Sequence, residues 1–428
     1  MAAFAPFEPQ PRLAAAVSGG ADSLALAVLL QDWAKAHGGG VVGLVVDHGL
    51  RDGSGAEARA VAARLAGLGL ESHVLRRPGP RPRANVQAAA REARYGLLTS
   101  WCARHGILHL VLGHQREDQG ETLLLRLGRG SGLDGLAGMA PLVEWPQLRL
   151  LRPLLGVPRD RLRATLRARG IGWTEDPSNR DPAHARVRMR DLAPRLAREG
   201  LSAARLAKTA AHLGRARAAL QDSVSVLLAR AAVPDPAGFV WLDPAIFGDA
   251  PAEVRLRALA RALMTVSGGA YPPRLASLER LESRITGGLK RGATLGGCRV
   301  LPRRGRVLLV REPVGAGSVA VAPGAALDWD GRFRVRLRRD ASLARRAGLR
   351  LGPLGNSGWA QIAAATPLLG NTLIPPPARA SLPALFDRHG VLEVPLLDYR
   401  RRPKTPVLMR VCRFAPRNSL TLPGFTVA

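Results

Sequence analysis

Short apolar runs alternate with helical stretches between residues 13 and 113, and this alternation constrains the fold more than any other feature of the chain. Strands are predicted at residues 13–17, 41–47, 71–75 and 108–113, and helices at residues 23–36, 55–68 and 85–104. Strands and helices that alternate in this way are typical of βαβ units, whose helices cover both faces of a parallel sheet. The sequence therefore predicts an α/β fold with a Rossmann-like parallel sheet, which binds ligands beyond the carboxyl ends of its strands.

A glycine turn joins the first predicted strand to the first predicted helix and reads Ser18-Gly19-Gly20-Ala21-Asp22-Ser23. The glycines let the backbone aim several N–H groups at one point, at the positive end of the helix dipole. The serine hydroxyls add donors, and the carboxylate of Asp22 is suited to hold a cation beside a phosphate. The segment lacks the lysine of the Walker phosphate loop. It predicts a site for an anion such as pyrophosphate, with an ordinary strand–helix turn as the alternative when the segment is taken alone.

A second polar segment ends the second predicted strand and begins with Asp47 and His48. Beside a nucleotide site, Asp47 is placed to meet a ribose hydroxyl, and His48 or Arg51 a phosphate. A polar cap of the strand is the alternative.

The densest polar segment, residues 113–122, follows the fourth predicted strand and leads into a helix predicted at residues 122–127. It contains His114, Asp118 and Glu121, and on a helix the two carboxylates share one face because they are three residues apart. Histidine and carboxylates opposite a phosphate loop are suited to magnesium-assisted chemistry on ATP. Capping of the helix is the alternative.

Five arginines outside these segments are candidates for binding a phosphate or an RNA backbone. They are Arg91, Arg94, Arg152, Arg186 and Arg190. Arginine suits this task because its planar guanidinium pairs with two phosphate oxygens at once. For Arg91 and Arg94 a solvated helix face is the alternative.

The charge balance points to a polyanionic partner. The chain has 63 Lys and Arg residues against 33 Asp and Glu residues, a net charge of +30. Aromatic residues make up only 4%, which favours contact with the backbone of a folded nucleic acid over stacking on single strands. The 3 cysteines form no CxxC pair, so a disulfide framework or zinc cluster is not expected. Without a leader or a membrane-spanning pattern, the expected location is the cytoplasm.

Changes in residue composition and in the hydrophobic pattern divide the chain into three predicted domains. Residues 1–192 form the ATP-binding domain, residues 193–312 a helical domain with a basic-tipped β-hairpin, and residues 324–428 a small mixed α+β domain. The second and third are expected to bind tRNA.

These motifs together resemble the tRNA(Ile)-lysidine synthetases, an adenylating branch of the pyrophosphate-loop ATP pyrophosphatases. The resemblance rests on SGGADS, VDHGLR, the helix ending at residues 93–95, the segment from His114 to Met139, RPLL and EDPSN. Residues 293–298 and 349–395 also resemble the family's two C-terminal RNA-binding domains. The family pattern His-His-x-Asp-Asp-x-x-Glu-Thr is altered here, because Gln115 replaces the second His and Glu117 the first Asp. Val187 also stands where the later arginine motif commonly has Asn.

The resemblance implies ligation of free L-lysine to C2 of the wobble cytidine of a CAU-anticodon isoleucine tRNA, through an adenylated cytidine. It implies ATP and Mg²⁺, with Ser18–Ser23, Asp47 and His48 at the nucleotide and Asp22 and Asp118 at the metal. Asp118, Glu121 and His114 are implied in catalysis or lysine binding. Another adenylating reaction such as tRNA thiolation, or an RNA-binding protein with a degenerate ATP loop, remains an alternative.

Overall fold

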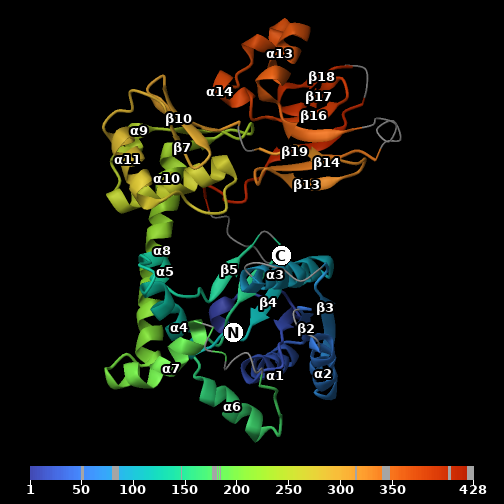
Figure 1. Ribbon diagram of the computed structural model, residues 1–428, viewed down its shortest axis with the longest axis vertical. Coiled ribbons are helices and arrows are strands. Elements are labelled where there is room, and N and C mark those ends of the chain that lie inside the picture. Colours follow the sequence, from blue (N-terminus) through green and yellow to red (C-terminus); the bar gives the residue numbers. More distant parts are fainter. Residues whose placement is uncertain are drawn as a thin grey trace. The chain divides into compact units, whose positions relative to one another are not determined.

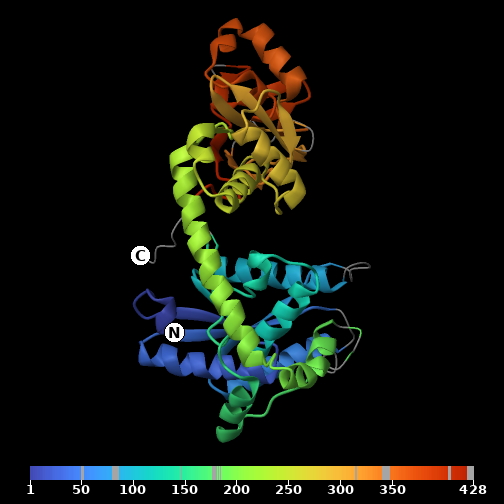
Figure 2. The same cartoon turned by 90° about the vertical axis from the view of Figure 1, so that its left-hand side faces the viewer.

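The computed structural model describes residues 1–49, 53–79, 86–145, 147–175, 181, 183, 185–313, 316–339, 348–402 and 406–421. Contacts divide the chain into two compact units, Met1–Ala218 and Ala219–Pro423, and the division falls within helix α8 (Ala203–Ala231). Figure 2 shows α8 as one continuous helix. Among the described residues, no helix combines the length and the apolar character needed to cross a membrane. The predicted three-domain boundaries stay a prediction.

The first unit is built on a six-stranded sheet, as predicted for an α/β fold. The strands are β1 (Arg12–Ala16), β2 (Gly40–Asp47), β3 (Glu71–Arg76), β4 (His109–Leu112), β5 (Leu142–Glu144) and β6 (Arg149–Leu151). Their order is β3-β2-β1-β4-β6-β5, and every neighbouring pair is parallel except β5 with β6. The Rossmann-like parallel sheet predicted from the sequence is therefore confirmed.

Helices cover both faces of this sheet, because successive residues of a strand point to opposite sides. Leu13 and Ala15 pack with α1 (Ala21–Ala36), α2 (Ser54–Gly67) and α6 (Arg159–Ala168). Ala14 and Ala16 pack with α3 (Val86–Arg104) on the other face. Figure 1 shows the sheet between these two layers.

Strands β1 and β4 are neighbours although β2 and β3 lie between them in the sequence. The chain therefore proceeds from β1 in one direction across the sheet and returns to add β4 on the other side of β1. A parallel sheet leaves a crevice at such a reversal, beyond the carboxyl ends of the two strands. The loops after β1 and β4 meet there.

Helix α4 (Arg116–Leu127) follows β4 and begins earlier than the predicted residue 122. It is followed by the short α5 (Leu133–Leu136) and, after α6, by α7 (Ala185–Arg198). Leu123 of α4 packs against Leu206 and Ala210 of α8. The arginine segment at residues 186–190 is therefore helical and lies on an element that packs beside α4.

The second unit begins with helices around a five-stranded antiparallel sheet. Its elements are β7 (Ala232–Pro234), β8 (Val240–Leu242), α9 (Pro244–Gly248), α10 (Ala252–Ser267), α11 (Leu275–Thr286), β9 (Ala293–Leu295), β10 (Cys298–Arg303) and β11 (Arg306–Arg311). Strands β10 and β11 form the predicted hairpin, with Arg303 opposite Arg306. Arg304 and Gly305 form its turn at φ 50° and 73°, as a two-residue hairpin turn requires.

The rest of the second unit is a small mixed α+β region. One sheet contains β12 (Val319–Ala320), β15 (Arg350–Pro353), β16 (Pro383–Asp387), β17 (Gly390–Val394) and β18 (Tyr399–Arg400); the other contains β13 (Ala326–Trp329), β14 (Phe333–Leu337) and β19 (Met409–Phe414). The accompanying helices are α13 (Gly355–Ala365) and α14 (Pro376–Arg379). Short 3-10 turns lie at Ala2–Phe4, Pro367–Asn371 and Pro395–Leu397.

Candidate active site

A cavity of about 380 Å³ lies in the first unit, at the reversal between β1 and β4. Its titratable lining residues are Asp22, Arg94, His114, Arg159, Arg163, Glu175 and Arg190. The phosphate-loop residues Ser18, Gly20, Ala21 and Ser23 line it as well. The structure thus brings together the loop, the histidine and the last arginine that the sequence singled out.

The loop after β1 is closed by its own serines. Ser23 Oγ accepts a hydrogen bond from Ser18 N at 3.1 Å and donates one to Gly20 O at 3.0 Å. Gly19 has φ +86°, and a Cβ there would lie 2.5 Å from Cγ2 of Val61. A side chain at this position is excluded both by conformation and by space. The first glycine of the motif is therefore required by the packing of α2 against the loop.

Gly113, directly after β4, brings the polar segment of residues 113–122 against the loop. A Cβ on Gly113 would lie 3.0 Å from the carbonyl oxygen of Asp22 and 3.1 Å from Cα of Ser23. The backbone after β4 thus touches the first turn of α1 directly. This contact sets His114 and the start of α4 beside the phosphate loop.

Asp22 is the acidic residue of the first turn of α1 and is held in an unfavourable environment. Burial raises the pKa of its carboxyl, and the charge of Asp118 acts in the same direction, whereas Arg159 opposes them. Its Oδ1 is buried and has no hydrogen-bond partner in the described structure. Buried carboxylate oxygens normally have a partner, so this oxygen is suited to receive a ligand.

Gln115 and Glu117, the two departures from the family pattern, both support the local fold. Gln115 is the N-cap of α4: its Oε1 accepts from Glu117 N at 2.5 Å, and its backbone N donates to Asp118 Oδ2 at 3.1 Å. Glu117 Oε2 accepts from the backbone N of Arg159 at 3.0 Å. Gln115 therefore starts α4 ahead of residue 122, and Glu117 ties α4 to α6.

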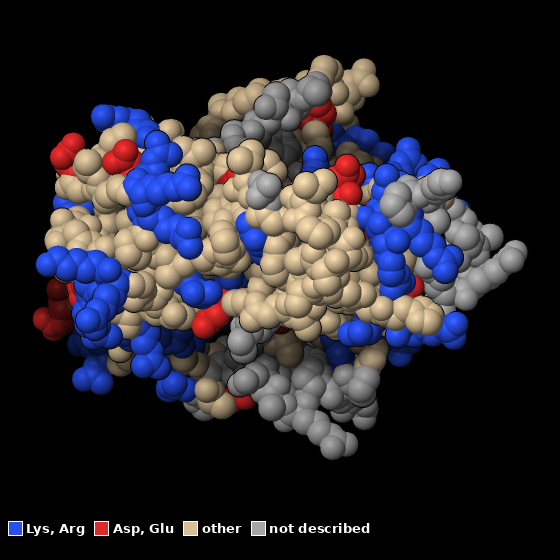
Figure 3. Space-filling model, turned by 90° about the horizontal axis from the view of Figure 1, so that it is seen from above, with Lys and Arg blue, Asp and Glu red and all other residues tan. Residues whose placement is uncertain are grey.

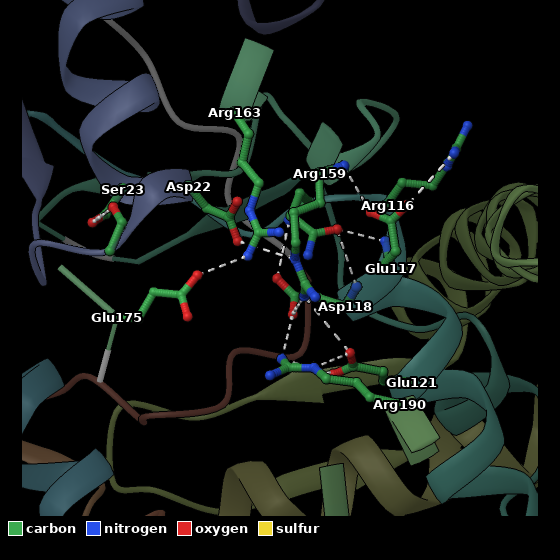
Figure 4. A network of polar contacts seen from close by, with 12 residues as sticks. Asp22, Ser23, Arg116, Glu117, Asp118, Glu121, Arg159, Arg163, Glu175 and Arg190 are labelled. Atoms are coloured by element: carbon green, nitrogen blue, oxygen red, sulfur yellow. Dashed lines mark hydrogen bonds and ion pairs between the residues drawn. The ribbon is translucent and has the colours of Figure 1, made fainter. Parts of the chain in front are cut away.

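Asp118 and Glu121 share the face of α4 that meets two arginines (Figure 4). Arg190 of α7 donates to Glu121 through Nε at 2.6 Å and Nη2 at 3.3 Å, and its Nη2 lies 3.6 Å from Asp118 Oδ1. Arg159 Nη2 lies 4.0 Å from Asp118 Oδ1 and 3.8 Å from Glu121 Oε1. Burial raises the pKa of Glu121, opposed by its hydrogen bond to Arg190.

His114 is a neutral imidazole at pH 7. Burial and the charges of Arg152, Arg94, Arg186 and Arg91 lower its pKa to about 3. Its Nδ1 is buried and has no hydrogen-bond partner within the described part of the chain. His114 is therefore suited to exchange a hydrogen bond with a ligand and not to carry a charge.

The five predicted arginines lie in different surroundings, and all but Arg190 act on the charge state of this histidine. Arg94 and Arg190 line the cavity. Arg152 is buried and donates to Ala140 O at 2.7 Å, whereas Arg91 and Arg186 are exposed. Arg91 also stacks on Tyr95, with its guanidinium carbon 5.1 Å from the ring centre.

Asp47 and His48 do not line the cavity. Asp47 Oδ1 accepts from Ser54 Oγ at 2.7 Å and from Gly49 N at 3.0 Å, and these hydrogen bonds, that of Ser54 foremost, lower its pKa. His48 is half-buried, and burial lowers its pKa. Arg51 and the residues from Asp176 to Asn179 lie outside the described residues.

Sequence reasoning missed the cavity residues that α6 contributes, and of the segment after α6 it named only Glu175, as the first residue of EDPSN. Arg159 and Arg163 line the cavity, as do Trp173, Thr174 and Glu175. Thr174 N donates to Gly19 O at 3.1 Å, so this segment is fastened directly to the phosphate loop. The i,i+4 spacing of the two arginines is a visible signal, but in a chain this rich in arginine it does not stand out.

The Mg²⁺ implied by the sequence resemblance fits two carboxylates of this site. Within the described ranges, no group of three or more His, Cys, Asp or Glu residues forms a metal centre. Magnesium, however, is commonly held by one or two carboxylates together with substrate phosphates. The unpartnered Oδ1 of Asp22, with Asp118 close enough to raise its pKa, meets that requirement in the part of the chain that the structure describes.

Comparison with known proteins finds relatives over most of the chain. Residues 1–196 match the model of a PP-loop domain family. A tRNA(Ile)-lysidine synthase from Ruegeria pomeroyi is 42% identical over 353 residues, which cover 81% of this chain and 82% of that protein. Proteins of the same name from Bradyrhizobium diazoefficiens and Methylobacterium nodulans are 40% and 44% identical, over 76% and 70% of this chain and 92% and 89% of theirs.

Proposed function

This chain belongs to the tRNA(Ile)-lysidine synthase family, and we propose from that premise that it ligates free L-lysine to C2 of the wobble cytidine of CAU-anticodon isoleucine tRNA. The resemblance inferred from the sequence motifs is thereby confirmed. The chain is an enzyme that modifies tRNA and uses ATP. The observation that best supports the proposed chemistry is that Arg159 and Arg190 line the cavity together with the phosphate loop and also meet the carboxylates of α4.

The proposed reaction has two steps. The C2 carbonyl oxygen of the cytidine attacks the α-phosphorus of ATP, and the α–β bond breaks to release pyrophosphate. The ε-amine of lysine, after losing a proton, then attacks C2, and the C2–oxygen bond breaks to release AMP. Adenylation is needed because an amine does not displace an amide-like carbonyl oxygen until that oxygen becomes a good leaving group.

We assign the nucleotide to the cavity at the end of β1. The loop Ser18–Ser23 binds the β- and γ-phosphates through its N–H groups and hydroxyls, at the positive end of α1. Asp22 and Asp118 are the residues that would hold Mg²⁺, which neutralises phosphate charge when bound. Asp47 and His48 do not line the cavity, so this assignment of the nucleotide rests on the loop residues and not on these two.

We assign the lysine substrate to the acidic face of α4. Asp118 and Glu121 suit an ammonium group, but both already face the guanidinium of Arg190. Lysine must therefore share these carboxylates with an arginine, which favours the neutral amine needed for attack. His114, uncharged at pH 7, offers a hydrogen bond beside them without adding a second positive charge.

We assign tRNA contacts to the basic residues outside the cavity. Arg91 and Arg186 are exposed near His114 and are proposed to meet the anticodon backbone, whereas Arg94 lines the cavity and Arg152 is buried. Lys and Arg greatly outnumber Asp and Glu on the face shown in Figure 3, and the net charge of +30 gives the same direction. The proposed site of action is the cytoplasm, which supplies tRNA, ATP and free lysine.

The test is incubation with ATP, radiolabelled lysine and a CAU-anticodon isoleucine tRNA transcript. Label is expected in the RNA only when ATP and lysine are both present, and not with a matched transcript whose wobble cytidine is replaced by uridine. RNA binding without pyrophosphate release would support a binding protein instead. Thiolation is disfavoured because Cys102 is buried, and burial raises the pKa of its thiol to about 12.

A further inference from the structure

Helix α6 presents two arginines to the cavity, four residues apart and on one face. They are Arg159, in its first turn, and Arg163, one turn later. Neither is needed for the sheet, because α6 packs on it through the buried side chains of Leu162 and Leu166. The two arginines are the part of α6 that faces the phosphate loop, as Figure 4 shows for their positions beside Asp22.

Arg159 is surrounded by carboxylates without being hydrogen-bonded to them. Its nitrogens lie 3.7 Å from Asp22, 4.0 Å from Asp118 and 3.8 Å from Glu121. Hydrogen bonds between N–H and oxygen span about 2.7–3.2 Å, so these contacts are electrostatic only. Arg190, in contrast, has two hydrogen bonds to Glu121. Arg190 is therefore fixed, whereas the N–H groups of Arg159 are available to a ligand.

Arg163 is available in the same way. Its Nη2 meets Glu175 Oε1 at 3.5 Å, which is at the limit of hydrogen bonding. Its Nε is buried and has no partner in the described structure. A buried guanidinium N–H beside a cavity is costly unless a ligand satisfies it.

The charge of the lining favours a polyanion in this place. Among the described residues, four arginines line the cavity against two carboxylates, and His114 is uncharged. The loop after β1 supplies N–H groups from one side, and α6 supplies guanidinium groups facing the first turn of α1. Pyrophosphate has oxygens on both sides, and planar guanidinium groups bind such oxygens in pairs.

We propose that Arg159 and Arg163 form a second pyrophosphate-binding element, which holds the β- and γ-phosphates of ATP and the leaving pyrophosphate from the side opposite the phosphate loop. The assignment rests on the proposed ATP-dependent function. On binding, Arg159 exchanges its distant carboxylates for phosphate oxygens, and Asp22 and Asp118 become free for the cation that accompanies ATP. Glu117 is a positioning residue in this scheme, because it fixes the first residue of α6 through the Arg159 backbone N–H.

The test compares the affinity of the full-length protein for inorganic pyrophosphate and for AMP, each with Mg²⁺, by calorimetric titration. R159Q and R163Q are expected to weaken pyrophosphate binding by about 10-fold to 100-fold, as removal of a charge-assisted hydrogen bond predicts. AMP binding is expected to change less than about twofold, because AMP lacks the β- and γ-phosphates. R159K retains the positive charge but not the planar guanidinium that binds two oxygens at once, so its pyrophosphate affinity is expected to lie between those of R159Q and the unaltered protein.

R161Q is the matched control, since Arg161 is exposed on the same helix and its replacement changes the net charge equally. Pyrophosphate affinities of R159Q and R163Q equal to that of R161Q would overturn the proposal, and so would equal losses for AMP and pyrophosphate. If R159Q fails to fold, R163Q and R159K decide. The lysine-labelling assay on the unaltered protein distinguishes failure of the α6 assignment from failure of the proposed reaction. If the unaltered protein forms lysidine but the variants bind pyrophosphate normally, only the α6 assignment is refuted. If no label enters the RNA but the variants lose pyrophosphate binding as predicted, only the proposed reaction is refuted.

Discussion

Asp22 illustrates how a single residue at this site is held in a state that costs stability. Its side chain is partly buried, one oxygen has no hydrogen-bond partner among the described residues, and the charge of Asp118 is close. Arg159 compensates only from 3.7 Å. Unfavourable burial of this kind is common where a residue is retained for ligand binding.

Replacing Asp22 by alanine is expected to abolish pyrophosphate release. The loop would lose the oxygen proposed to hold a cation beside the phosphates, whereas the arginines proposed to bind tRNA would be unaffected. We expect tRNA affinity to stay within a few-fold, measured by filter binding, and pyrophosphate release to be undetectable in a coupled assay. Asp32→Ala is the control, because Asp32 lies exposed on the same helix and pairs with Arg169 at the surface. A large drop in tRNA binding in Asp22→Ala would show that the residue is structural.

The raised pKa of Asp22 also predicts a pH-dependent change in stability. The carboxyl binds its proton more tightly in the folded protein than in the unfolded chain, where its pKa is the ordinary 3.8. The folded protein therefore loses stability as pH rises from 3.8 through the raised pKa of the folded state. Asp22→Asn removes the charge and keeps the shape. We expect a higher free energy of unfolding than the unaltered protein at pH 7, with the difference shrinking toward pH 4, measured by urea titration. An equal or lower stability at pH 7 would contradict the direction of the shift.

Helix α4 shows how one capping residue controls the placement of two carboxylates, Asp118 and Glu121. Gln115 accepts hydrogen bonds from the backbone N of Glu117 and Asp118, so the helix starts there. Asp118 and Glu121 then share the helix face that meets Arg159 and Arg190. A start at residue 122 would leave Asp118 and Glu121 in a loop. The substitution of glutamine in the family pattern is thus compatible with the geometry of the site.

Gln115→Ala is expected to destabilise the first unit by about 1–2 kcal/mol, the usual effect of removing an N-cap. Gln115→Asn keeps a short amide, a strong N-cap, and is expected to recover most of this stability. Thermal unfolding monitored by circular dichroism provides the measurement. If the asparagine variant were as unstable as the alanine variant, packing around the buried side chain and not the cap would explain the effect.

The sequence predicts elements well where periodicity is strong and poorly where polar residues determine the structure. Strands β1 to β4 and helices α1 to α3 lie almost at their predicted residues, because apolar residues repeat there at the period of a strand or helix. The start of α4 carries no apolar repeat, and glutamine is not a usual cap. The contributions of Arg159 and Arg163 depend on how α6 returns to the loop, which local pattern does not encode.

At the scale of the whole molecule, the two halves of the second unit are tied together by distant segments of the chain. Leu420 packs into the core formed by α8, α10 and β11, and Thr265 Oγ1 of α10 donates to Asn418 O at 2.7 Å. Asp330 accepts from Arg311 and from the fully buried Arg332. Removing the last part of the chain would therefore expose the core of the first half, so charge substitutions at the surface are the better probe of tRNA binding.

The tip of the β10–β11 hairpin supplies such a probe, since Arg303, Arg304 and Arg306 are exposed at its end. We expect the triple variant Arg303→Gln, Arg304→Asn, Arg306→Gln to bind tRNA more weakly, with a shallower dependence of affinity on salt. Removing one arginine–phosphate ion pair should reduce the slope of log K against log salt concentration by about 0.7–0.9, because fewer counterions are released. Asparagine at 304 tolerates the left-handed backbone found there, so the turn is preserved. Arg334→Gln is the control, since Arg334 is partly exposed but already paired with Asp328 at 3.0 Å. An unchanged slope in the triple variant would place the RNA backbone elsewhere on this unit.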